Sequence, residues 1–220
     1  MTPASGRIGV LGGTFDPVHE GHVAAADAAL RVLGLDRVLF IPSRQPPHRQ
    51  GELHTPASDR LAMVSLAVAP RNEFVASDLE LRREGPSFTA DTLRELHRDG
   101  FEPWQIFFII GTDAFAEIAS WREYPALLDL ANFVVIARPG QSFDAMRGHV
   151  AALAPRMRTA GDGSAPPPDR GSCAIFLVNA ATPDVSSTGI RERAARGLPL
   201  TGLVAPEVER YIRMHRLYGS

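Results

Sequence analysis

The chain has 220 residues, of which 45% are hydrophobic, so it is long enough to bury the core of one α/β domain. Its formal net charge of −2 gives no electrostatic basis for strong nonspecific binding to nucleic acid or to anionic membranes. The single cysteine, Cys173, excludes an internal disulfide and a cysteine-based zinc site, and we expect it to be a small buried apolar residue.

Six short apolar runs suit buried β-strands, and helix-like patterns lie between most of them. The predicted strands are Arg7–Leu11, Arg37–Ile41, Glu73–Leu81, Gln105–Ile110, Asn132–Ala137 and Cys173–Asn179. The predicted helices are Gly21–Leu33, Thr55–Ala69, Thr89–Asp99, Gly111–Trp121, Pro125–Leu130 and Pro206–Leu217. This alternation predicts a parallel α/β sheet in a single domain over residues 1–220.

Residues 155–172 break this pattern, because Gly, Ser, Asp and three consecutive prolines dominate the segment. We predict a flexible surface loop there, and its position before the last strand leaves a lid role open. No signal-like segment and no apolar run of about 18 residues is found. We therefore expect a cytoplasmic protein with no membrane or nucleic-acid partner. Homo-oligomer formation is left open.

The segment Gly12–His22, GGTFDPVHEGH, joins the first predicted strand to the first predicted helix. Its glycines let backbone N–H groups approach an anion closely, and a helix start leaves N–H groups unpaired. His19 and His22 are spaced to share one face of the first helical turn. The segment lacks the dinucleotide pattern G-x-G-x-x-G, and the chain contains no P-loop pattern. The junction therefore predicts a phosphate site of a different kind.

Gly12–His22 resembles the GGTFDPxHxGH signature of the nucleotidylyltransferase superfamily, and it is most similar to the bacterial nicotinate-nucleotide adenylyltransferase family. Ser186–Arg191, SSTGIR, is similar to the SSTxIR element of the same superfamily. The resemblance implies a Rossmann-like open parallel sheet with helices on both faces, of the HxGH nucleotidyltransferase type. It also implies transfer of the adenylyl group of ATP to nicotinate mononucleotide, giving nicotinate adenine dinucleotide (deamido-NAD) and pyrophosphate in NAD biosynthesis.

Such a transfer depends on positioning and charge stabilisation, because the attacking phosphate is already an anion. The resemblance assigns catalysis to His19, His22 and Arg191. It assigns ATP and phosphate contacts to Gly12, Gly13, Thr14, Phe15, His48, Ser187, Thr188 and Ile190. The serines before Thr188 would also suit an ordinary helix N-cap. Mg²⁺ is expected to be held mainly by ATP phosphates and water, with no metal ligand from the protein.

Recognition of the acceptor is predicted in the middle of the chain. Glu84–Thr89, EGPSFT, resembles the family's GPSYT segment, and Thr89 opens a helix whose start suits a carboxylate. An indole such as Trp121 can stack on a pyridinium ring, although core packing is the alternative. The resemblance assigns nicotinate nucleotide binding to Thr89, Asp113, Trp121 and Arg122, with Arg138 as a further phosphate-contact candidate. The sequence departs from the family pattern at Arg49, Phe88 and Arg122, where Lys, Tyr and Tyr are usual.

Several alternatives stay open at this point. Nicotinamide mononucleotide and pantetheine phosphate are competing acceptors for the same chemistry. A noncatalytic nucleotide sensor and a nucleic-acid module related to class I synthetases are alternatives of other classes. Retention of His19, His22 and Arg191 argues against a sensor, because binding alone does not need every transition-state donor.

Overall fold

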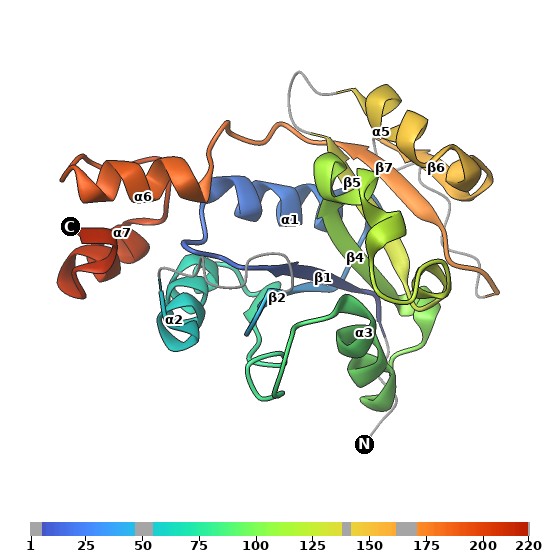
Figure 1. Ribbon diagram of the computed structural model, residues 1–220, viewed down its shortest axis with the longest axis horizontal. Helices are drawn as coiled ribbons and strands as arrows, with labels where there is room; N and C mark the ends of the chain where they lie inside the picture. Colours follow the sequence, from blue (N-terminus) through green and yellow to red (C-terminus); the bar gives the residue numbers. More distant parts are fainter. Residues whose placement is uncertain (1–5, 47–54, 138–141, 162–170, 220) are drawn as a thin grey trace.

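The computed structural model describes residues 6–46, 55–137, 142–161 and 171–219. Seven strands form one parallel sheet in the order β3-β2-β1-β4-β5-β7-β6 (Figure 1). The strands are β1 (Ile8–Gly13), β2 (Arg37–Pro42), β3 (Phe74–Ala76), β4 (Ile106–Gly111), β5 (Asn132–Ala137), β6 (Met157–Ala160) and β7 (Ile175–Asn179). The α-helices are α1 (Glu20–Leu33), α2 (Ala57–Val68), α3 (Thr89–Arg98), α4 (Thr112–Ala116), α5 (Phe143–His149), α6 (Ser187–Ala195) and α7 (Pro206–Met214). Short 3-10 helices lie at Pro103–Gln105, Ile118–Ser120, Ala126–Asp129, Ala151–Arg156 and Leu217–Gly219.

Side chains of the central strands alternate between two hydrophobic cores, one on each face of the sheet. In β4, Phe107 and Ile109 join the core that contains buried residues of α1, α2, α6 and α7. Ile106, Phe108 and Ile110 join the opposite core, which contains buried residues of α3, α4 and α5. Strands buried on both faces need continuous apolar runs, as the sequence has. The predicted open parallel sheet with helices on both faces is confirmed.

The order of the strands reverses between β1 and β4, since β2 and β3 follow on one side of β1 and β4 onward on the other. Ligands of open α/β sheets bind at the carboxyl ends of the strands beside such a point. The ends at Gly13, Pro42 and Gly111 lie there. This edge of the sheet is therefore where a site is expected, as the sequence predicts.

Several predicted helices end where expected. Gly34 follows α1 in the left-handed conformation (φ 57, ψ 50), which glycine adopts without steric cost, so its predicted role as a C-cap is confirmed. Other predictions were wrong. The predicted helix Pro206–Leu217 ends at Met214, and the predicted helix Pro125–Leu130 is the 3-10 helix Ala126–Asp129. The predicted helix to Trp121 stops at Ala116, because the N–H of Glu117 bonds to Ala114, three residues back, and a 3-10 turn follows. The predicted strand Glu73–Leu81 is only β3, since the chain then turns.

The prediction of a loop over residues 155–172 was wrong for residues 155–160. Met157–Ala160 forms β6, which pairs in parallel with β7, and Ala151–Arg156 is a 3-10 helix before it. This short strand lies at an edge of the sheet, with Arg158 and Thr159 exposed, so it lacks the apolar run of a central strand. Helix α5 was also not predicted. Residues 162–170 lie outside the described residues.

Candidate active site

Helix α1 begins immediately after His19, at the end of the loop that leaves β1. The His19 and His22 rings stack with centroids 3.7 Å apart, and the His19 backbone N–H donates to His22 Nδ1 at 3.2 Å. With Nδ1 as an acceptor, the neutral His22 ring carries its proton on Nε2 and makes that atom a donor. A Cβ at Gly21 would lie 3.0 Å from His19 Nδ1, so a larger residue at position 21 would displace the His19 ring. The predicted pairing of the imidazoles on one helical turn is confirmed.

The second motif lies against the first, although 170 or more residues separate their contact partners. The Ser187 hydroxyl donates to the Pro17 carbonyl at 2.9 Å. Arg191 Nη1 donates to the Asp16 carbonyl at 2.9 Å, and its Nη2 donates to Thr188 Oγ1 at 3.2 Å. Helix α6 therefore places its N-terminus and a guanidinium beside the loop that carries His19. We call this side of the site, residues 12–22 with 186–191, the motif wall.

Ser186 caps α6, because its Oγ accepts the backbone N–H of Gly189 at 3.2 Å. The N-cap alternative is therefore confirmed for Ser186, whereas Ser187 and Thr188 lie inside the helix. The Ile190 side chain is buried in the core and its N–H bonds to the Ser186 carbonyl, so we assign it to packing rather than to a phosphate contact.

One cavity of about 660 Å³ opens at the carboxyl ends of β1 and β4. Eight of the predicted site residues line it: Gly12, Gly13, Thr14, His22, Thr89, Asp113, Trp121 and Arg122. His19 is only 5% exposed and stacks on His22, while the buried Phe15 ring meets His22 edge-on at 4.9 Å. Both rings therefore pack against the His22 ring. The Phe15 side chain is buried, so it cannot make the phosphate contact predicted for this residue. Ser187, Thr188 and Arg191 do not line the cavity; Ser187 and Arg191 bond to Pro17 and Asp16, in the loop between the cavity-lining Thr14 and His22.

The opposite side of the cavity is aromatic. Thr89 is the first residue of α3, and the Trp121 ring meets Phe108 edge-on with centroids 6.2 Å apart. The Arg122 guanidinium lies 4.7 Å from the Phe88 ring centroid and pairs with Asp91 at 3.4 Å. We call residues 87–92 with 120–123 the aromatic wall. It supplies a flat ring, a helix N-terminus and a cation to the same cavity.

Sequence reasoning missed Ser43, Glu80 and Phe108 as lining residues. Ser43 follows β2, and its hydroxyl donates to the Gly13 carbonyl at 3.2 Å. Because β1 and β2 are adjacent in the sheet, the end of β2 could have been predicted to lie beside the glycine turn. Glu80 is 7% exposed and accepts a hydrogen bond from Thr92 Oγ1 at 2.6 Å. Burial raises the pKa of the Glu80 carboxyl. Nothing in the sequence marks it, because it lay inside a predicted strand.

His48, Arg49 and Arg138 lie outside the described residues. Among the residues that are described, no group of three or more His, Cys, Asp or Glu side chains could hold a metal ion. No described helix is long and apolar enough to span a membrane.

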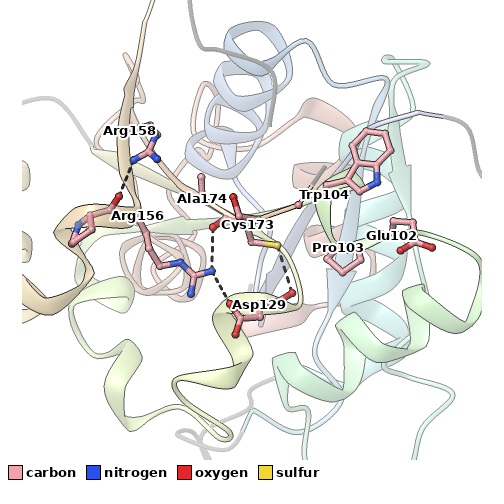
Figure 2. Close-up of a pocket in the computed structure, with 11 residues that line it drawn as sticks. Glu102, Pro103, Trp104, Asp129, Arg156, Arg158, Cys173 and Ala174 are labelled. Carbon is pink, nitrogen blue, oxygen red and sulfur yellow. Dashed lines mark hydrogen bonds and ion pairs between the residues drawn. The ribbon is translucent and has the colours of Figure 1, made fainter. Parts of the chain in front are cut away.

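A second pocket, of about 610 Å³, is lined by residues that precede β4, β5 and β7 and therefore lies at the amino ends of these strands. Figure 2 shows its lining side chains. Its Arg156 guanidinium already donates to the carbonyls of Leu128 and Cys173 and to Asp129 Oδ1. Cys173 is half-buried rather than fully buried, and its thiol donates to the Asp129 carbonyl. Burial raises the pKa of this thiol to about 11, which keeps it unreactive.

The fold and the site together define a nucleotidyltransferase of the HxGH type. The cytidylyltransferase-like family model matches residues 10–193, and the chain belongs to this family. It is 44% identical over 212 residues to "Probable nicotinate-nucleotide adenylyltransferase" of Symbiobacterium thermophilum, a match that covers 96% of this chain and 95% of the relative. A protein of the same name from Roseiflexus sp. is 40% identical, with 98% and 99% covered. Within the family the chain therefore belongs with the nicotinate-nucleotide adenylyltransferases.

Solved structures agree with the fold. The Plasmodium falciparum nicotinic acid mononucleotide adenylyltransferase complexed with APC superposes with a TM-score of 0.70 at 19% identity, covering 97% of this chain and 98% of that one. The same enzyme complexed with NaAD gives a TM-score of 0.69 at 19% identity, with 97% of each chain covered.

Proposed function

We propose that this protein transfers the adenylyl group of ATP to nicotinate mononucleotide, giving nicotinate adenine dinucleotide and pyrophosphate in NAD biosynthesis. The observation that carries the proposal is that one cavity joins the two walls. Gly12, Gly13 and His22 line it from the motif wall, and Thr89 and Trp121 from the aromatic wall. Two substrates that must react with each other need one shared cavity.

The reaction joins a phosphate oxygen of the mononucleotide to the α-phosphorus of ATP. The bond from that phosphorus to the β-phosphate oxygen breaks, and pyrophosphate leaves with the electron pair. No general base is needed, because the attacking oxygen is already anionic. His22 Nε2–H and the Arg191 guanidinium are the donors for charge that develops on the phosphate oxygens, and His19 fixes the His22 ring. The N-termini of α1 and α6 favour the same negative charge.

The aromatic wall suits a nicotinate ring. The Trp121 indole offers a face for stacking on a cationic pyridinium ring, and Thr89 begins α3, whose positive end favours a carboxylate. Arg122 adds a positive charge, although it departs from the family pattern and is shared with Asp91. A carboxamide would gain less from the same charges. This wall therefore supports the acid over the amide.

Mg²⁺ fits this site as an ion carried by ATP. The described residues offer hydrogen-bond donors, and two acids line the cavity, Asp113 and Glu80, but the described residues hold no group of three or more side chains that could bind a metal ion. A hard cation held by phosphate oxygens and water needs no such cluster. When bound, Mg²⁺ would offset charge on the triphosphate. A cytoplasmic location, the absence of a nucleic-acid partner and homo-oligomer formation stay predictions.

The test is pyrophosphate release with ATP and Mg²⁺, with nicotinate mononucleotide, nicotinamide mononucleotide and phosphopantetheine as separate acceptors. We expect the nicotinate nucleotide to be preferred over the amide in kcat/KM by at least about tenfold. Preference for the amide would overturn the argument from the aromatic wall and keep the chemistry. Nucleotide binding without pyrophosphate release on any acceptor would support the sensor alternative instead.

A further inference from the structure

The C-terminal turn reaches back to the first motif. Tyr218, in the 3-10 helix Leu217–Gly219, donates its hydroxyl hydrogen bond to Asp16 Oδ1 at 2.7 Å, across 202 residues of sequence. Asp16 is 2% exposed, and the same carboxylate oxygen accepts a hydrogen bond from the Thr55 hydroxyl. A buried carboxylate needs such donors, because leaving it without them costs free energy. Tyr218 is thus one of the hydrogen-bond donors that offset the free-energy cost of burying the Asp16 carboxylate.

Asp16 lies in the loop between β1 and α1, between the glycine turn and the histidines. Its backbone carbonyl accepts from Arg191, so both its side chain and its main chain are held by the C-terminal region. The fully buried Arg60 holds the same loop from below, through its Nη1 bond to the Thr14 carbonyl at 2.6 Å. The Glu20 N–H at the start of α1 also bonds to the Leu203 carbonyl at 2.9 Å. Each of these contacts holds the loop between β1 and α1 or the first residue of α1.

The backbone at the C-terminal turn is held in an unusual conformation. Arg216 and Tyr218 have φ angles of 50° and 62°, in the left-handed region that non-glycine residues rarely adopt. Such residues persist where the surrounding structure determines them. The turn packs on α6 and α7. Burial, and then the Asp16 carboxylate, raises the pKa of Tyr218 above its usual range, so the phenol stays protonated and can donate.

We propose that Tyr218 is a positioning residue: through Asp16, its hydroxyl holds the loop that orients His19 and His22 for adenylyl transfer. Tyr218 itself does not line the cavity. The inference rests on the proposed function, because it concerns the rate of that reaction. A small displacement of catalytic groups is costly, so a single hydrogen bond behind the loop affects turnover more than binding.

The chain offers a matched control in Tyr211. It lies in α7, and its hydroxyl donates to Asp59 Oδ1 at 2.8 Å, so it makes the same kind of phenol–carboxylate bond. Asp59 belongs to α2 and is not part of the loop. Tyr211→Phe and Tyr218→Phe in the full chain therefore remove equivalent bonds, of which only one reaches the first motif.

The experiment measures steady-state pyrophosphate release and melting temperature for wild type and both variants. We expect Tyr218→Phe to lower kcat about tenfold and to leave both KM values within about threefold. We expect Tyr211→Phe to keep the wild-type kcat. The imidazole ¹⁵N signals of His19 and His22, assigned with single histidine variants, should shift in Tyr218→Phe and not in Tyr211→Phe.

Wild-type kcat together with unshifted imidazole signals in Tyr218→Phe would overturn the proposal. So would losses of kcat that follow the melting temperature equally in both variants, since that indicates a merely structural role. If Tyr218→Phe does not fold, Thr55→Val removes the other donor to the same oxygen and should reproduce the low kcat and the shifted signals; its failure to do so overturns the proposal. An inactive wild type would instead refute the proposed function.

Discussion

The two walls of the cavity are held by different kinds of interaction. The groups that hold the motif wall are buried: Asp16 is 2% exposed, His19 5%, and Arg60 of α2, which bonds to the Thr14 carbonyl, 0%. On the aromatic wall the Arg122 and Asp91 side chains that pair with each other are 50% and 32% exposed. Buried hydrogen bonds to charged groups are little screened by solvent, whereas exposed ion pairs contribute little and weaken in salt.

This difference teaches where the site is rigid and where it is adaptable. The transition-state stabilisation that we propose needs donors whose positions do not change during the reaction, and the loop of the motif wall is held by partners far apart in the sequence. Acceptor recognition needs a ring face and charges at an open surface. Substitutions such as Phe88 and Arg122, where the family usually has Tyr, occur on that second wall.

The largest effect is expected on the motif wall. We expect His22→Ala to lower kcat on the order of 10²–10³-fold, since removing one positioned donor to a developing anion has that cost. Its affinity for ATP, measured by calorimetry, should change much less than its turnover. The control is His149→Ala, because His149 lies exposed at the end of α5. Equal losses of affinity and turnover in His22→Ala would contradict a transition-state role.

A smaller effect is expected on the aromatic wall. Trp121→Ala should raise the KM for nicotinate mononucleotide about 2- to 30-fold, the equivalent of ~0.5–2 kcal/mol of stacking. The KM for ATP should stay near wild type. The control is Trp104→Ala, which removes the other tryptophan, at the second pocket by the amino ends of β4, β5 and β7 (Figure 2). An unchanged acceptor KM in Trp121→Ala would assign that indole to core packing.

The smallest expected effect is on the free energy of unfolding, and it concerns Glu80. This carboxyl is buried, unlike the exposed ion pair of the aromatic wall, and it accepts a hydrogen bond from Thr92 of that wall. Its pKa is raised in the folded state by burial, so its charged form is disfavoured there. The folded state binds this proton more tightly than the unfolded state does. The stabilisation that the protonated Glu80 carboxyl gives to the folded state is fully present below the pKa of this carboxyl in the unfolded chain. It is lost as the pH rises through the pKa of the carboxyl in the folded state.

Glu80→Gln has no charge to bury at any pH. We therefore expect its free energy of unfolding, relative to wild type, to rise as pH increases from about 4 to about 7. Urea unfolding at several pH values measures this difference. A difference that stays constant or falls over that range would contradict the assignment.

The sequence predicted the chemistry of the motif wall. The order strand, glycine turn, paired histidines is local, and Gly12, Gly13 and His22 were found from it because they lie within eleven consecutive residues, from the end of β1 to the first turn of α1. The alternation of apolar runs also determined the parallel sheet. Local patterns failed at β6, where a short edge strand with exposed Arg158 lacks the run that a buried strand requires.

Only the tertiary structure decided how the site is supported. Glu80, Ser43 and Tyr218 carry no local signal, because a glutamate, a serine or a tyrosine is as ordinary on a surface as in a buried network. Their roles arise when the fold brings together segments far apart in the chain, as Tyr218 and Asp16 are brought together across 202 residues. A hydrogen bond depends on distance in space, whereas a sequence pattern records only distance along the chain. For this protein the sequence therefore predicts which groups do the chemistry, and the packed structure determines what holds them in place.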